Sequence, residues 1–157
     1  MQHTCHAYAR FRVRTNRRVF LCPEDLVMTV SSSRPPGRYW EAFSPFRSLS
    51  HGWLDGTHGR APSASGLSWL TRQFETYYPD ELPMPWIYPT AEGGVQLEWR
   101  SGDREITLDI DLDRQIGEWH GLDLSTGDES ADNLDLSNSE GWSELGRRLC
   151  ELGGIDR

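Results

Sequence analysis

The sequence predicts an α+β fold: an antiparallel β-meander of four or five strands packed on helices on one face. Residues 104–112 alternate between apolar and polar side chains, as a half-buried strand does. Residues 63–78 and 139–152 repeat apolar side chains at helical spacing. Turn-forming glycine, aspartate and serine residues separate short strand-like runs between those two helices, which is typical of a meander. At 157 residues the chain fits one domain, which we place at residues 38–157.

The first helical region comes before the sheet. Residues 38–54 carry aromatic and leucine side chains at spacings of three and four. Pro45 interrupts this stripe, because proline lacks the N–H that a helix interior needs. We therefore expect a short helix over 38–43 and a second over 45–54, or one broken helix.

The other two helices have clearer ends. The helix over 63–78 begins at Ser63, a residue type that caps helix N-termini, and Pro79 stops it. The helix over 139–152 has an acidic residue in its first turn and two arginines in its last, the signs that suit the helix dipole. The Gly153-Gly154 pair ends it.

Five strand-like runs lie between those two helices. They are residues 86–88, 95–99, 104–112, 118–124 and, as a short edge strand, 133–136. The predicted inner face carries the apolar side chains Val95, Leu97, Trp99, Ile106, Leu108, Ile110, Leu112, Leu122 and Leu124. We expect the two long helices to cover this face, because an antiparallel sheet commonly packs helices on one side only.

The other face of the predicted sheet is acidic. It carries Gln96, Glu98, Thr107, Asp109, Asp111, Trp119 and Asp123, with Tyr88 nearby. Like charges opposite each other on a sheet cost up to about 1 kcal/mol unless a cation neutralises them. We interpret this face as a docking surface for a basic protein, with Trp119 as the aromatic anchor. The predicted partner-binding residues are Gln96, Glu98, Asp109, Asp111, Trp119 and Asp123. A second interpretation is a solvated outer face that keeps the sheet from edge pairing.

Charge supports a basic partner. All sixteen basic residues are arginine, against twenty-four acids, for a net charge of −8. Residues 1–60 carry nine arginines and four acids, 9 − 4 = +5, and residues 61–157 carry seven and twenty, 7 − 20 = −13. Such asymmetry bears on partners and not on fold. We therefore predict a non-enzymatic binding protein of the antitoxin, immunity or defence-accessory type, with its partner encoded nearby.

Metal and catalytic sites have weaker support. Asp109, Asp111 and Asp113 form a row on a strand and not a pocket, and no glycine-bent loop completes a calcium site. The three cysteines are an odd count without zinc spacing, and no P-loop, G-x-S-x-G or H-E-x-x-H motif occurs. We predict no metal, no cofactor and no catalytic residue. The alternative function is a small metal-dependent hydrolase or nuclease that uses Glu98, Asp109 and Asp111.

Residues 1–37 form an arginine-rich extension that a Ser, Pro and Gly cluster separates from the rest. We interpret it as a poorly ordered segment, or residues 1–27 as sequence upstream of a natural start at Met28. A third interpretation is an arm for nucleic acid, which the acidic body disfavours because it would repel phosphates. No run approaches the ~18 apolar residues of a membrane span, and the first twenty lack the core of a secretory signal. We therefore expect a cytoplasmic protein without membrane contact.

Three stretches carry a resemblance. They are Trp53-Leu54-Asp55-Gly56, the segment 85–99 (P-W-I-Y-P-T-A-E-G-G-V-Q-L-E-W) and Gly117-Glu118-Trp119-His120. Over roughly residues 50–150 the chain resembles a group of small uncharacterised bacterial proteins that share the block I-Y-P-T-x-E-G-G-V-Q-x-E-W. The resemblance implies a bacterial, cytoplasmic protein of the kind often encoded beside a larger partner. It implies no activity and no site residue.

Overall fold

A computed structural model describes residues 38–153, so the predictions for residues 1–37 lie outside the described residues. The helices are α1 (Arg38–Phe43), the 3-10 helix η2 (Ser44–Ser48), α2 (Ala64–Tyr77) and α3 (Ser139–Gly153). The strands are β1 (Trp86–Pro89), β2 (Val95–Ser101), β3 (Arg104–Asp111), β4 (Ile116–Asp123) and β5 (Glu129–Asp135). No helix in this part of the chain is long and apolar enough to cross a membrane.

The five strands form one sheet in the order β1-β2-β3-β4-β5, and every neighbouring pair is antiparallel. This confirms the predicted α+β fold with an antiparallel meander. The β3–β4 turn shows how the sequence reverses the chain. The carboxylate of Asp111 accepts the N–H groups of Asp113 and Arg114, each at 2.9 Å, and Gln115 takes the left-handed conformation with φ 59°.

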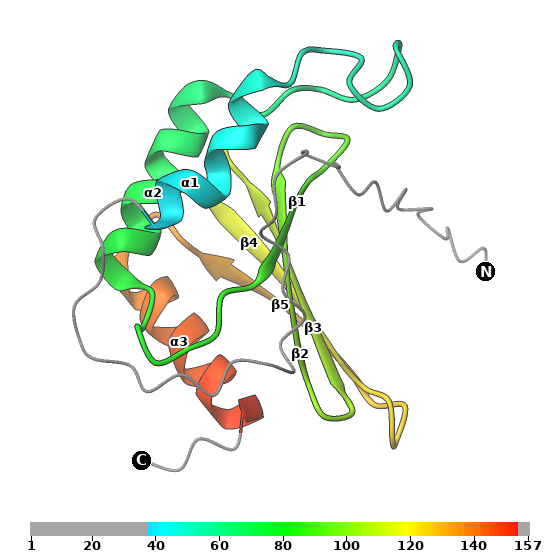
Figure 1. The fold of residues 1–157 in the computed structure, drawn as a ribbon. Coiled ribbons are helices and arrows are strands. Elements are labelled where there is room, and N and C mark those ends of the chain that lie inside the picture. The colour runs from blue at the N-terminus through cyan, green and yellow to red at the C-terminus, as the bar shows by residue number, and fades with distance from the viewer. Residues whose placement is uncertain (1–37, 154–157) are drawn as a thin grey trace. The chain divides into compact units, whose positions relative to one another are not determined.

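The helices lie on one side of the sheet, as Figure 1 shows. Leu67, Leu70 and Phe74 of α2 are fully buried, at spacings of three and four that place them on one helical face. The ring of Trp142 in α3 meets that of Phe74 edge-on, with centroids 5.2 Å apart. Inward side chains of the sheet, among them Leu108, complete a single aromatic-rich core.

The helix boundaries follow their capping residues. The Ser63 hydroxyl accepts the N–H of Gly66 at 3.1 Å at the start of α2. Before α3, the side-chain oxygen of Asn138 accepts two backbone N–H groups, each at 3.0 Å. The expected helix over 45–54 is shorter, because only η2 forms there. The chain then folds into turns that include Gly52 with φ 84°, a conformation that favours glycine.

The predicted phase of strand β4 was wrong. Trp119 lies opposite Leu108 on the inner face and is only 4% exposed, whereas Leu124 is 50% exposed. The strand ends at Asp123, so Leu124 lies beyond it and does not indicate which side chains of β4 face inward. Leu122 lies opposite Glu105, on the outer face.

Two glycines make room for Trp119 on the inner face. Gly117 and Gly121 flank it at alternate positions on the same side of the strand. A Cβ atom on Gly117 would lie 2.8 Å from Cδ1 of Leu108, closer than two carbon atoms normally approach. The glycine-x-tryptophan-x-glycine pattern therefore describes one crowded face, in which a large ring sits between two positions without side chains.

Candidate functional site

The candidate site is the face of the sheet away from the helices, which we call the open face. No described helix covers it (Figure 1). Strand register sets its layout. In one row Gln96 lies opposite Asp109, which lies opposite Glu118. In the next row Glu98 lies opposite Thr107, which lies opposite His120.

The open face is strongly acidic. By register it carries Glu98, Glu105, Asp109, Asp111, Glu118, Glu129 and Asp135. The strands bring one arginine to this face, Arg100, which forms an ion pair with Glu105. Seven acids and one arginine give 1 − 7 = −6. A concentrated charge of one sign attracts oppositely charged partners and raises their association rates.

Asp109 is the central carboxylate of the face and is half-buried. Burial raises the pKa of Asp109 above its ordinary value, and the charges of Glu118 and Glu92 raise it further. The hydrogen bond from Gln96 and the proximity of His120 act the other way. Oxygen Oδ1 of Asp109 is out of solvent and has no hydrogen-bond partner among the described residues. A buried oxygen of this kind costs stability until a donor reaches it.

Asp111 has a structural role in addition to its place on the face. Its Oδ1 accepts the two N–H groups of the β3–β4 turn, and Asp113 leaves the row to pair with Arg60 at 2.8 Å. Among the described residues, no group of three His, Cys, Asp or Glu side chains is placed to hold a metal ion. No observation in this part of the chain therefore favours the metal-dependent hydrolase built on Glu98, Asp109 and Asp111.

Two of the six predicted partner-binding residues were placed on the wrong face. Gln96, Glu98, Asp109 and Asp111 lie on the open face as predicted, while Trp119 and Asp123 lie on the helix side. One carboxylate oxygen of Asp123 accepts the hydroxyl and N–H of Ser125 and the N–H of Thr126. These bonds lower the pKa of Asp123, and the hydrogen bond from the Ser125 hydroxyl to the Asp123 carboxylate is the largest cause. Asp123 therefore shapes the β4–β5 turn, and Trp119 belongs to the core.

Sequence reasoning missed several residues of the open face. Glu118 and His120 come to it because Trp119 turns inward, and Glu129 comes because β5 begins earlier than expected. It also missed Trp86, which lies opposite Glu98 at the β1 edge and is half-buried. The signal that could have found Glu118 and His120 is the pair of glycines beside Trp119, which marks the crowded inner side of β4.

One further cluster has catalytic residue types but not a catalytic arrangement. In the loop before α2, Nδ1 of His58 lies 2.6 Å from Oδ2 of Asp55. The Thr57 hydroxyl bonds Asp55 Oδ1 at 2.9 Å and approaches the same Nδ1 at 3.0 Å. A nucleophile of a triad would instead meet Nε2, the other ring nitrogen. Asp55 also accepts two loop N–H groups, so the cluster closes the loop.

No family model matches this chain, and comparison with curated proteins and with solved structures gives no match. The resemblance to small bacterial proteins noted above stays a prediction. Function must therefore be inferred from the geometry and charge of the open face.

Proposed function

We propose that this chain is a non-enzymatic binding protein whose open face docks a basic segment of a protein partner. The partner is of the kind that an antitoxin, immunity or defence-accessory protein would bind, and its gene lies nearby. The single observation that carries the proposal is the uncompensated −6 charge on a sheet face that no described helix covers.

A solvated outer face accounts less well for Asp109. Burial raises the pKa of this carboxyl, so its ionised form costs stability at neutral pH. Glu118 lies directly opposite Asp109 on the neighbouring strand β4 and adds like-charge repulsion. A guanidinium or ammonium group placed over the Asp109–Glu118 pair would remove both costs. Binding sites commonly retain charges that the fold alone does not favour.

We assign to Trp86 the role of aromatic anchor that the sequence analysis predicted for Trp119. It stands at the β1 edge opposite Glu98, so an apolar ring borders the acidic rows. Aromatic side chains beside charged groups are frequent interface hot spots. The stem of a partner arginine or lysine would pack on this ring while its charge meets the carboxylates.

A charge reversal tests the proposal. Full-length chain carrying Glu118→Arg is compared with wild type in binding to the purified product of the adjacent gene, by calorimetry at several salt concentrations. Glu118 lies in the centre of the open face and is exposed. We expect the dissociation constant to rise by about tenfold or more, because like charges then meet at the interface. Wild-type affinity should fall with added salt.

The matched control is Glu81→Arg. Glu81 is exposed in the segment between α2 and β1, and its reversal changes the net charge by the same amount. Binding should be nearly unchanged in this variant. An equal loss in both variants would show that only net charge matters, and no loss in either would contradict docking on the open face.

A further inference from the structure

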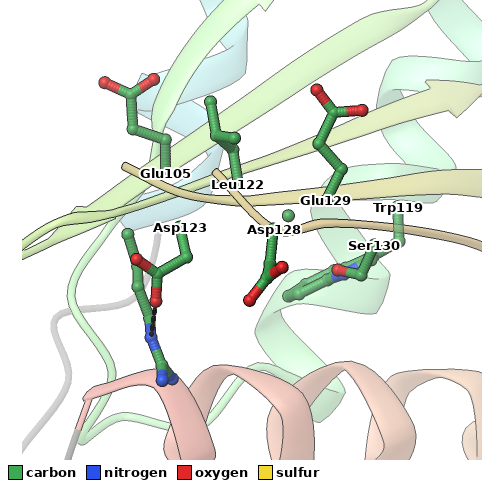
Figure 2. Close-up of a pocket in the computed structure, with 9 residues that line it drawn as sticks. Glu105, Trp119, Leu122, Asp123, Asp128, Glu129 and Ser130 are labelled. Atoms are coloured by element: carbon green, nitrogen blue, oxygen red, sulfur yellow. Dashed lines mark ion pairs between the residues drawn. The ribbon is translucent and has the colours of Figure 1, made fainter. Parts of the chain in front are cut away.

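A small cavity lies on the helix side of the sheet, at the end where β3, β4 and β5 meet the β4–β5 turn. Its volume is about 250 Å³. Figure 2 shows Trp119, Asp123, Asp128 and Ser130 on the cavity side of the strands, while the side chains of Glu105, Leu122 and Glu129 project to the opposite side. The cavity thus opens on the helix side of the strands that form the open face, although Glu105, Leu122 and Glu129 also belong to its lining.

Small residues create this space. Gly121 lies opposite Ser130 in the β4–β5 pair, next to Trp119 on the inner face. A Cβ atom on Gly121 would lie 2.6 Å from Ser130 Oγ and 3.5 Å from Trp119 Nε1. The absence of that carbon leaves the indole edge and the serine hydroxyl facing the same opening.

The indole N–H of Trp119 has no hydrogen-bond partner among the described residues, although the side chain is 96% buried. Of the other buried indoles, that of Trp69 likewise has no acceptor among the described residues, whereas those of Trp99 and Trp142 do. Trp99 Nε1 donates to the Tyr78 hydroxyl at 2.9 Å, and Trp142 Nε1 donates to the carbonyl of Leu136 at 2.9 Å. Buried indole N–H groups usually have an acceptor. Among the described residues, the fully buried side-chain nitrogen and oxygen atoms without a partner are Arg47 Nε and Asp109 Oδ1, so the Trp119 N–H is not sealed from solvent and is open to an acceptor from outside the fold.

Asp128 supplies the opposite polarity. Figure 2 shows its carboxylate directed toward the edge of the Trp119 ring. Oδ2 of Asp128 accepts the hydroxyl of Thr126 at 2.8 Å, which leaves Oδ1 available to a donor. The neighbouring carboxylate of Asp123 is already committed, since Nε of Arg104 lies 3.5 Å from it and turn N–H groups bond it. The cavity lining thus includes one N–H donor and one carboxylate.

We propose that this cavity receives an arginine side chain of a protein partner, with the guanidinium on Asp128 and a main-chain carbonyl of the same segment accepting from Trp119 Nε1. Guanidinium suits the carboxylate because its planar N–H groups match carboxylate geometry. The proposal rests on the proposed function and deepens it, because it identifies a second contact of the basic partner. A segment bound here would continue around the β4–β5 edge toward Glu129 and the open face.

The test uses N-acetyl-arginine amide as a minimal probe and the full-length chain labelled with nitrogen-15. The assigned indole N–H signal of Trp119 is followed by NMR during titration. We expect a saturable shift with a dissociation constant on the order of 1 mM, as suits so small a ligand. N-acetyl-citrulline amide, the neutral isostere, should bind about tenfold more weakly, because it lacks the charge-assisted hydrogen bond. Equal binding of both probes, or no shift of this signal, would overturn the proposal.

A pair of adjacent residues gives the matched control. Asp128→Asn and Glu129→Gln remove the same charge, but their side chains project to opposite sides of the strands. Asp128→Asn should weaken probe binding about tenfold, while Glu129→Gln leaves it within about twofold. The reverse pattern would refute the cavity site. If the probe does not bind in the cavity but Glu118→Arg still weakens partner binding, the cavity proposal is refuted and docking on the open face stands. If the probe binds as expected but Glu118→Arg leaves partner binding unchanged, docking on the open face is refuted and the cavity site stands.

Discussion

Truncation of Trp119 to alanine tests the corrected phase of β4 directly. The side chain is 4% exposed, packs in the core and has the guanidinium of Arg148 above its ring at 5.7 Å. A tryptophan buries roughly 150–250 Å². At about 25 cal/mol per Å² this burial contributes about 4–6 kcal/mol. Buried tryptophan-to-alanine changes cost about 3–5 kcal/mol in practice, so we expect about 4 kcal/mol.

The assay is urea unfolding followed by far-UV circular dichroism, since a tryptophan variant changes the fluorescence signal itself. A loss of about 4 kcal/mol is large for a domain whose total stability is about 5–15 kcal/mol. The control is Trp86→Ala, the same substitution on the open face. Trp86 is half-buried at an edge strand, so we expect a loss of about 1 kcal/mol.

The two variants separate the core from the interface. If Trp119 instead pointed outward as a docking anchor, its truncation would leave stability nearly unchanged and remove partner binding. That outcome, or a larger stability loss for Trp86→Ala than for Trp119→Ala, would refute the inward placement of Trp119 and with it the cavity that its indole edge lines.

Two further predictions concern charge. Asp109→Asn should stabilise the fold by a few tenths to about 1 kcal/mol at neutral pH, because burial raises the pKa of Asp109. The folded state keeps the Asp109 proton to a higher pH than the unfolded state does, so the stability of the wild type falls as the pH rises through the folded pKa. The stability difference between Asp109→Asn and wild type should vanish below the ordinary pKa of 3.8, where the wild-type carboxyl is protonated in both states. Asp135→Asn is the control of opposite sign, since hydrogen bonds from Ser137 lower the pKa of Asp135. Arg148→Ala should cost about 1–2 kcal/mol in urea unfolding, because Arg148 joins α3 to β5 through Asp132 at 2.6 Å. Arg147→Ala should cost less, because Arg147 forms its ion pairs with Glu144 and Glu151 within α3.

The fold was predictable because its main signals agree. In β3, Ile106, Leu108 and Ile110 alternate with polar residues, so a shift of one position would expose every apolar side chain. The helices carry apolar stripes, and residues of known capping and stop types mark their ends. Where the signals were thin the prediction failed: η2 spans only Ser44–Ser48. Pro45 lies in its first turn, where proline is tolerated, so it separates α1 from η2 but does not explain why η2 ends early.

The candidate site was only partly predictable for a related reason. In residues 118–124 the apolar side chains divide between the two phases, with Trp119 in one and Leu122 and Leu124 in the other. Counting leucines favours the wrong phase, because the count cannot tell where the strand ends. Strand register decides the matter, since it pairs Leu108 with Trp119. Register depends on contacts between strands, which a pattern within one strand does not contain.

The phase correction changes what kind of interface the open face is expected to form. With Trp119 inside, the face consists mainly of carboxylates, and its aromatic contribution moves to the β1 edge at Trp86. Exposed charges raise association rates and set specificity more than they raise affinity. Affinity must then come from polar groups that gain a hydrogen-bond partner on binding. Asp109 with its unbonded oxygen and the indole N–H of Trp119 in the cavity are two such groups among the described residues. A partner that reaches both groups would associate at a rate that depends on salt and dissociate at a rate that depends on these two contacts. Glu118→Arg should therefore change mainly the association rate, and Asp128→Asn mainly the dissociation rate.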